Sequence, residues 1–296
     1  MQLWKQLLLN LYYHATLPAR WRNCRRMATE DRLPAIVLFW HRVADDRATP
    51  WTISNATFAR QIRWLDRQFE FVTLAELQQR IAARSNRRPC VSLTFDDGYA
   101  DNCREAIPLL IREQIPCTYF VTLRNVLDGE PFKHDTDNGY RFAPNSPEQL
   151  RAMAAAGIDI GVHTYTHPNL AAIGDVDELR REMLGAKQDL EKLLDRETRY
   201  FSFPFGQPAN LSAAAFCMAR EAGYAGVCSG YGGYNTPGDD PFHLQRIAVD
   251  NAMIHLKNWA TMDPRKLRTP RIEYGSAAVC EPSPSSLAAC EAASGL

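Results

Sequence analysis

The stretch that most constrains the fold runs from Val91 to Asp101. Four apolar or β-prone residues lead into two adjacent carboxylates, Asp96 and Asp97, and Gly98 follows at once. This pattern predicts a buried strand that presents both carboxylates at its carboxyl end, where ligands collect in parallel α/β folds. A simple turn is the alternative, because Asp and Gly are common turn residues. Adjacent carboxylates repel each other unless a positive group lies beside them, and a metal ion would supply one.

Short apolar runs recur along the chain and are separated by patterns typical of amphipathic helices. Two of these helices begin with capping-box patterns, Thr73 to Glu76 and Ser146 to Gln149. About seven strands that alternate with helices favour a barrel-like α/β architecture over an open sheet. The predicted strands are residues 35–40, 91–95, 117–122, 158–162, 200–203, 225–229 and 244–249.

Composition divides the chain into three parts. Residues 33–262 hold the predicted strands and form one α/β domain. Residues 263–296 are poor in large apolar side chains and rich in Ser, Ala and Pro, which predicts a disordered tail. Residues 1–32 form an amphipathic extension, for which docking on the domain is favoured over peripheral contact with a membrane surface. No apolar run is long enough to predict a transmembrane segment.

Charge and cysteine content bound the partners and the location. The 34 basic residues balance the 34 acidic ones, so no global field attracts nucleic acid and none is expected as a partner. The eight cysteines include no Cys-x-x-Cys pair, which favours a reduced compartment. A short apolar run near the N-terminus lacks a clear small-residue cleavage site, so a cytoplasmic location is expected.

A pair of histidines follows a later predicted strand. His163 and His167 are four residues apart directly after residues 158–162. On one helical turn, or a tight loop that imitates one, side chains at this spacing face the same way and can hold one cation. The spacing alone also occurs by chance. Because this pair and the Asp96-Asp97 pair both follow strands, both are expected on the same rim of a parallel barrel, which favours a shared metal site.

Two stretches resemble a known family. Residues 94–99, Thr-Phe-Asp-Asp-Gly-Tyr, and residues 163–167, His-Thr-Tyr-Thr-His, resemble the first two motifs of the polysaccharide deacetylases, also called NodB-homology or carbohydrate esterase family 4 domains. The likeness covers residues 33–255. It implies a distorted (β/α)7 barrel, a divalent metal ion that is most often zinc, and removal of acetyl groups from N-acetylated sugars. It also implies that Asp97, His163 and His167 are metal ligands and that Asp96 is the general base.

The third family motif is usually Arg-Pro-Pro-Tyr-Gly, and residues 202–206 read Ser-Phe-Pro-Phe-Gly in its place. Phe205 stands at the aromatic position, so the resemblance implies a groove wall and a backbone N–H for an oxyanion there. Ser202 replaces the arginine that would orient the base. Some family members with a Phe-Ser-Tyr-Pro-type sequence also lack it. We hypothesise that Arg246, on a later strand, is the positive partner of Asp96.

Two histidines compete for the role of general acid. A family subgroup with an early Tyr-His-x-Val strand uses that histidine, and residues 39–43, Phe-Trp-His-Arg-Val, resemble it, so His41 is favoured. Other family members supply a histidine from a late Leu-x-x-His motif, and His255 is the competitor for that role here. His255 lies in a helical pattern, so a structural or surface position is expected for it. Glycines and tyrosines in residues 230–236 suit a loop that approaches a sugar ring, although an ordinary flexible loop is the alternative. The predicted substrate-binding residues are Tyr99, Phe205, Gly206, Tyr231 and Arg246.

The sequence thus predicts a metal-dependent hydrolase that deacetylates an N-acetylated oligo- or polysaccharide. Two alternatives stay open. Related barrels cleave other linear or cyclic amides, so the substrate could be a non-carbohydrate amide. The missing arginine of the third motif also allows a catalytically silent carbohydrate-binding domain.

Overall fold

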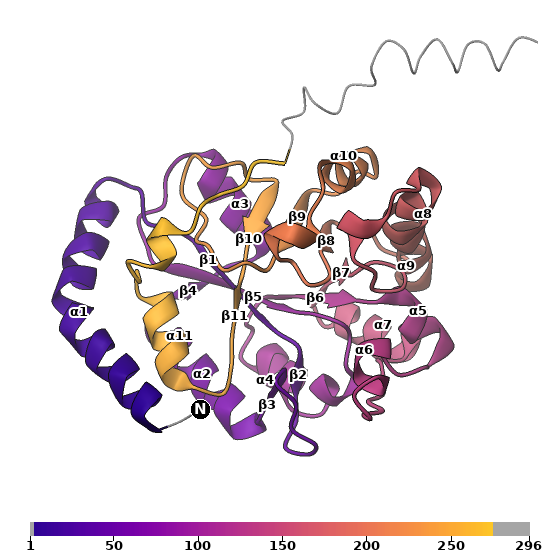
Figure 1. The fold of residues 1–296 in the computed structure, drawn as a ribbon, viewed down its shortest axis with the longest axis horizontal. Coiled ribbons are helices and arrows are strands. Elements are labelled where there is room, and N and C mark those ends of the chain that lie inside the picture. The colour runs from indigo at the N-terminus through magenta and orange to yellow at the C-terminus, as the bar shows by residue number, and fades with distance from the viewer. Residues whose placement is uncertain (1–2, 275–296) are drawn as a thin grey trace, which may run out of the picture.

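Buried apolar runs form the parallel strands of a nearly closed barrel in the computed structural model, which describes residues 3–274 (Figure 1). The strands follow one another around the barrel in the order β10, β9, β8, β7, β6, β5, β1 and β11. Arg246 alone separates β10 from β11, so one interrupted strand pairs with β9 by its first half and with β1 by its second. Counted in this way, the barrel has the predicted seven strands, and the (β/α)7 prediction is confirmed. The barrel strands are β1 (Ile36–Trp40), β5 (Cys90–Phe95), β6 (Cys117–Val121), β7 (Asp159–Val162), β8 (Tyr200–Ser202), β9 (Gly226–Ser229), β10 (His243–Gln245) and β11 (Ile247–Ala248).

Three short strands lie beside the barrel. β2 (Arg42–Val43) pairs in parallel with β3 (Thr52–Ile53), and β4 (Glu70–Phe71) pairs with the start of β5. Residues 41–53 therefore form a loop with its own small sheet directly after β1. This loop carries His41 and Trp51 at the carboxyl end of the barrel.

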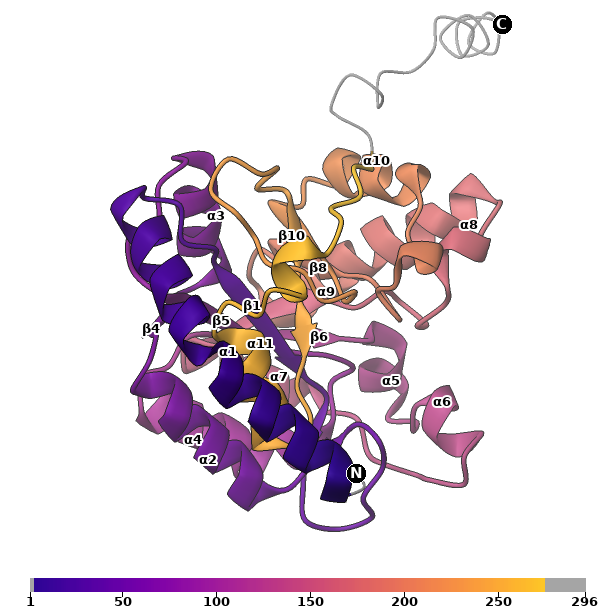
Figure 2. The same cartoon turned by 60° about the vertical axis from the view of Figure 1, so that its left-hand side comes forward.

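Helices surround the barrel on its outside (Figures 1 and 2). Both predicted capping boxes are present, with Thr73 and Ser146 as the capping residues. A π-helical segment, η3 (Arg181–Gly185), joins α8 to α9. The helices are α1 (Leu3–Thr29), α2 (Asn55–Asp66), α3 (Leu74–Ala82), α4 (Ala106–Arg112), α5 (Leu123–Asp128), α6 (Lys133–Thr136), α7 (Pro147–Ala155), α8 (Val176–Arg180), α9 (Ala186–Leu194), α10 (Ala213–Glu221) and α11 (Met253–Ala260).

Both ends of the described chain pack on the domain. α1 lies alongside α11 (Figure 2), where the buried Arg20 guanidinium donates to the Asn258 carbonyl at 2.7 Å and to Asn258 Oδ1 at 2.8 Å. Tyr274 stacks on Phe216 with ring centroids 4.6 Å apart, and Asp263 is fully buried. The prediction of a disordered tail is therefore wrong for residues 263–274, while residues 275–296 lie outside the described part. Within residues 3–274, no helix is long and apolar enough to cross a membrane.

Candidate active site

Strand register brings the predicted site residues to one rim. Trp40 of β1 pairs with Phe95 of β5, so His41 and Asp96 follow at the same level. Val121 of β6 pairs with Val162 of β7, and the His163 backbone N–H donates to the Val121 carbonyl at 2.9 Å. The carboxyl ends of β1, β5 and β7 therefore meet around one cavity of about 690 Å³. Its lining includes Phe39, His41, Trp51, Asp96, Asp97, His134, Tyr140, His163, His167, Phe205 and Arg246.

Asp97, His163 and His167 converge as a candidate metal centre. Asp97 Oδ1 lies 3.5 Å from His163 Nε2 and 3.4 Å from His167 Nε2, and one ligand atom from each residue fits within 4.8 Å of the others. Asp97 Oδ1 is buried and has no hydrogen-bond partner. A buried carboxylate oxygen without a partner is costly, and a cation between it and the two imidazoles would satisfy it. The three side chains therefore fit a divalent metal ion with nitrogen and oxygen ligands.

Strained backbone holds these ligands in place. Asp97, Thr164 and His167 have φ values of 71°, 65° and 65°, in the left-handed region that L-residues rarely adopt. Gly98 follows Asp97 with φ 99°, and a Cβ there would lie 3.1 Å from a Val121 methyl carbon, so the turn requires glycine. Such strain persists where the surrounding structure enforces it, which is common at functional sites.

Hydrogen bonds fix the orientation of both histidines. His163 Nδ1 lies 2.8 Å from the Ser202 carbonyl oxygen. Because a carbonyl only accepts, Nδ1 carries the proton and the Nε2 lone pair faces Asp97. Burial lowers the pKa of His163 to about 4, so its ring is neutral at neutral pH. The His167 backbone N–H donates to Thr164 Oγ1 at 2.8 Å.

Glu182 holds the loop that carries these histidines. Its Oε2 accepts from the backbone N–H groups of Tyr165 and Thr166 at 2.9 and 2.8 Å, and its Oε1 accepts from the Thr166 hydroxyl at 2.7 Å. Glu182 is buried and belongs to the π-helical segment η3. π-Helical turns often occur at functional sites, and this one turns a carboxylate toward the metal-ligand loop.

Asp96 is paired with Arg246. The guanidinium donates to Asp96 Oδ1 at 2.7 Å and to Oδ2 at 2.8 Å, and also to Ser202 Oγ at 2.7 Å and Thr94 Oγ1 at 3.1 Å. Both members of the pair are buried. Burial opposes ionisation of Asp96, but the charge of Arg246 outweighs it and keeps the Asp96 pKa below its usual range. The hypothesised contact is thus present, and Asp96 is an ionised carboxylate beside the candidate metal centre.

His41 lies in the same cavity against aromatic rings. Its ring centroid is 4.7 Å from that of Trp51 and 5.5 Å from that of Phe39. Burial lowers the pKa of His41, while the charges of Asp97 and Asp96 oppose that shift. His255 lies on α11 outside the cavity lining, where it bonds to Asp250 Oδ2 at 2.5 Å and stacks on Trp259. Position therefore favours His41 as the acid, and the role itself stays a prediction.

The long connection of residues 128–145 contributes side chains that the sequence did not single out. It contains α6 and delivers His134, whose Nε2 lies 3.8 Å from Asp97 Oδ2. The Tyr99 hydroxyl lies 2.9 Å from His134 Nε2 and donates to Asp135 Oδ2 at 2.8 Å. Trp51, which is 54% exposed, was also missed. An aromatic residue in the loop after β1 and a histidine in a long connection were the available signals.

Three of the predicted substrate-binding residues, Tyr99, Gly206 and Tyr231, lie outside the cavity lining. Tyr99 is buried between Phe132 and Phe142 and supports the long connection, so it does not line the cavity. Tyr231 also lies outside the cavity lining, 6.0 Å from the His243 ring. Gly206 has a packing role instead, because its carbonyl accepts from the Gly230 N–H at 2.8 Å and a Cβ would lie 2.5 Å from that nitrogen.

The other two substrate-binding candidates do line the cavity. Phe205 is 56% exposed and has φ 62°. Arg246 is buried and bound to Asp96, so it orients a carboxylate and has little surface left for a ligand.

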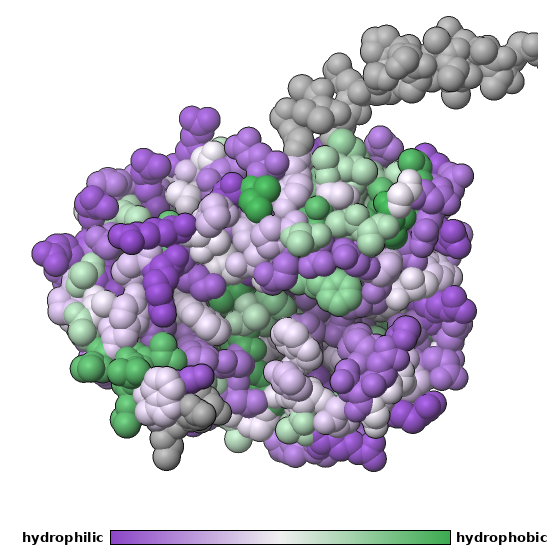
Figure 3. Space-filling model, viewed as in Figure 1, coloured by the Kyte–Doolittle hydropathy of each residue, from purple (hydrophilic) through white to green (hydrophobic). Residues whose placement is uncertain are grey.

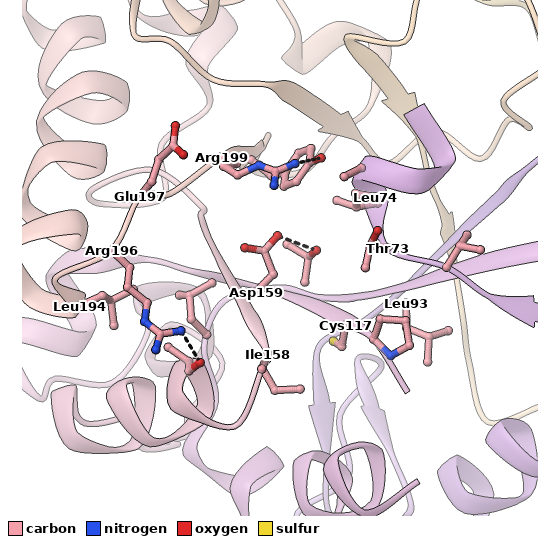
Figure 4. A pocket seen from close by; sticks show the side chains of 18 residues that line it. Thr73, Leu74, Leu93, Cys117, Ile158, Asp159, Leu194, Arg196, Glu197 and Arg199 are labelled. Carbon is pink, nitrogen blue, oxygen red and sulfur yellow. Dashed lines mark hydrogen bonds between the residues drawn. The ribbon is translucent and has the colours of Figure 1, made fainter. Parts of the chain in front are cut away.

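A second cavity lies at the opposite end of the barrel (Figure 4). It measures about 340 Å³ and is lined by residues at the starts of strands, such as Cys117 of β6 and Asp159 of β7. The Thr118 hydroxyl donates to Asp159 Oδ2 at 3.2 Å, and burial raises the Asp159 pKa. No histidine lines this cavity. Among residues 3–274, the side chains that could together hold a metal ion lie at the carboxyl end of the barrel.

That end joins a carboxylate with an unpaired oxygen, two oriented imidazoles and a second, ionised carboxylate on one barrel rim. This arrangement defines a (β/α) barrel hydrolase with a candidate metal centre.

Known proteins agree with that class. The family model described as polysaccharide deacetylase matches residues 83–227 of this chain. The putative polysaccharide deacetylase YxkH of Bacillus subtilis is 24% identical over 229 residues, or 76% of this chain and 75% of that protein. The poly-β-1,6-N-acetyl-D-glucosamine N-deacetylase of Staphylococcus aureus is 24% identical over 221 residues, or 71% of this chain and 72% of that protein. The solved structure of IcaB from Ammonifex degensii is 27% identical with a TM-score of 0.65, and the match covers 77% of this chain and 97% of that one.

Proposed function

We propose that this chain is a metal-dependent hydrolase that removes acetyl groups from the N-acetylated sugars of an oligo- or polysaccharide. The observation that carries the proposal is the buried, unpaired Asp97 oxygen between two imidazoles, beside the ionised Asp96. Relatives are named for poly-β-1,6-N-acetyl-D-glucosamine and chitooligosaccharides, and these are the first substrates to test.

Asp97, His163 and His167 would hold the cation. A divalent ion there, zinc being the first candidate for this donor set, supplies a Lewis acid that polarises the acetyl carbonyl and lowers the pKa of a water molecule. Asp96 accepts a proton from the attacking water, and Arg246 keeps this carboxylate ionised and fixed in orientation. His41 donates a proton to the amine that leaves the acetyl group.

A backbone donor completes the set. The Phe205 N–H has no acceptor among residues 3–274, and the positive φ of Phe205 turns this group away from regular pairing. It donates to the oxygen that becomes negative when the carbonyl is attacked, which favours the transition state over the ground state.

The cavity suits a sugar ring. Its volume of about 690 Å³ holds more than one pyranose unit, and two exposed aromatic rings, Trp51 and Phe205, lie on its wall. The apolar face of a sugar packs on such rings. An extended amide chain without rings would leave these faces uncovered, so a carbohydrate is favoured over a non-carbohydrate amide.

Acetate release tests the proposal. The purified chain is incubated with chitin oligomers, poly-β-1,6-N-acetyl-D-glucosamine and peptidoglycan fragments, with and without a chelator, and metal content is measured by mass spectrometry. We expect acetate from at least one sugar, loss of release with chelator, and restoration by zinc. The Asp96→Asn variant should retain the metal and lose activity.

The two alternative functions predict different results in this assay. A silent binding domain would bind the sugars and release no acetate under any metal. A non-carbohydrate amidase would hydrolyse simple amides and leave every sugar untouched. Acetate release that chelator does not change would contradict the metal mechanism.

A further inference from the structure

The outward face of α1 begins with large apolar side chains. Leu7, Leu8 and Leu11 are 70%, 55% and 67% exposed. The space-filling view shows a strongly hydrophobic region at the lower left, where the N-terminal end of α1 lies in the same view of the ribbon (Figures 1 and 3). Trp21, further along the helix, is 65% exposed. Contiguous apolar patches of this kind mark interaction sites in soluble domains.

The exposure does not come from a loosely placed helix, because its opposite face is anchored. Arg20 is 1% exposed and bonds to Asn258 on α11 at 2.7 and 2.8 Å. The Tyr12 hydroxyl donates to Asp263 Oδ1 at 2.9 Å. α1 thus presents one fixed face to the domain and the other to the surroundings.

The outward face ends in positive charge. Residues 1–29 contain no Asp or Glu, whereas the whole chain has a net charge of zero. Arg22, Arg25 and Arg26 are exposed, and their helical spacing places them on the same face as Leu7 and Leu11. This face therefore runs from an apolar half to a basic half over 27 residues, about 40 Å.

We infer that α1 binds the surface of an anionic lipid bilayer. The leucines enter the boundary between headgroups and acyl chains, Trp21 lies at headgroup level, and the three arginines contact lipid phosphates. Helices that lie in the interface plane are rich in Lys and Arg and in Trp, Phe and Leu. α1 carries these residue types, with the leucines and the arginines at opposite ends of one face. This role is independent of the proposed hydrolysis.

A second copy of the chain fits this face less well. Parallel pairing would bring the three arginines of one copy against those of the other, and like charges repel. Antiparallel pairing would bury arginines against leucines without a counter-charge. An anionic bilayer satisfies both halves at once.

Vesicle co-sedimentation tests the inference with the full chain. Vesicles of phosphatidylcholine alone are compared with vesicles that also contain phosphatidylglycerol. We expect the chain to sediment with the anionic vesicles and to be released by high salt. The triple variant Arg22→Gln, Arg25→Gln, Arg26→Gln should lower partitioning by about fivefold per arginine. The triple variant Leu7→Gln, Leu8→Gln, Leu11→Gln should lower it by at least about tenfold.

The control variants change exposed apolar and basic residues on other parts of the surface. They are Ile111→Gln with Leu127→Gln and Val176→Gln, and Arg104→Gln with Arg112→Gln and Arg151→Gln. These variants should sediment like the parent chain, and circular dichroism checks that all variants fold. The inference fails if the parent chain stays in solution with both vesicles, or if the control variants lose binding equally. Analytical ultracentrifugation tests the alternative of a second copy. The inference also fails if the parent chain binds no vesicles but self-associates, and if the leucine variant abolishes that self-association. The outward face of α1 would then bind a second copy of the chain.

Discussion

Replacing Arg246 by methionine should impair both stability and turnover. The guanidinium binds both oxygens of Asp96 at 2.7 and 2.8 Å and reaches Ser202 Oγ at 2.7 Å. Methionine keeps much of the volume and removes every one of these donors. Asp96 would then be a buried charge without a partner, among the costliest groups a protein can contain.

The expected loss follows from that burial. Removing one member of a buried ion pair costs about 3–5 kcal/mol of unfolding free energy. Turnover should fall by about 10²–10⁴, the usual contribution of a general base, because Asp96 would lose its ionised, oriented state. The double variant Asp96→Asn, Arg246→Met leaves no unpaired charge, so most of the lost stability should return while turnover stays low.

Urea unfolding and acetate release measure the two effects on the same protein. Arg20→Met is the matched control, because Arg20 is equally buried but bonds to Asn258 far from the cavity. It should lower the unfolding free energy and leave turnover unchanged. Full turnover in Arg246→Met would refute the assignment of Arg246 as the partner that positions Asp96. A double variant no more stable than Arg246→Met would refute the unpaired-charge argument.

Three further predictions concern side chains around the cavity and the far end of the barrel. His41→Ala should lower turnover by about 10²–10⁴, and His255→Ala should leave it unchanged; equal rates in the two variants would contradict the choice of acid. Trp51→Ala should raise KM for oligosaccharides by about tenfold with little change in kcat, which initial-rate kinetics can separate. Burial lowers the pKa of His243 to about 3. Below pH 6.5 this residue therefore binds more protons in the unfolded state than in the folded state, and the unfolding free energy decreases as the pH is lowered. Between pH 7 and pH 5 this residue should cost about 2 kcal/mol in urea unfolding, and the loss should be absent in His243→Gln.

The barrel could be predicted because its signals are local. Each predicted strand is a short run whose burial on both faces needs nothing beyond apolar side chains, and β5 is buried along its whole length. Because parallel strands end at one rim, the positions of Asp97 and His163 after their strands sufficed to bring them together. The capping boxes at Thr73 and Ser146 were equally local, and both are present.

Other parts of the site depend on contacts between segments far apart in the sequence. His134 reaches Asp97 only because the Tyr99 hydroxyl fixes the long connection through Asp135, 36 residues away. Glu182 points at the histidine loop because a π-helical turn shifts its direction, and helical periodicity alone predicts a regular helix there. Neither the turn nor the fold of a long loop follows from the local sequence, so the contact of Tyr99 with Asp135 could not be predicted.

Arg246 shows why a missing motif residue need not mean a missing charge. In a barrel, inward-facing side chains from different strands meet in the same layer, so the carboxylate that directly follows β5 can be reached from several strands. Ser202, at the position of the family's arginine, places a small hydroxyl where a longer side chain would collide with the guanidinium from the β10–β11 junction. The serine therefore makes room for Arg246 and also binds it. The positive partner of Asp96 thus comes from another strand. Arg246 can take this role because its side chain lies in the same layer of the barrel as Asp96, although the two residues are far apart in the sequence.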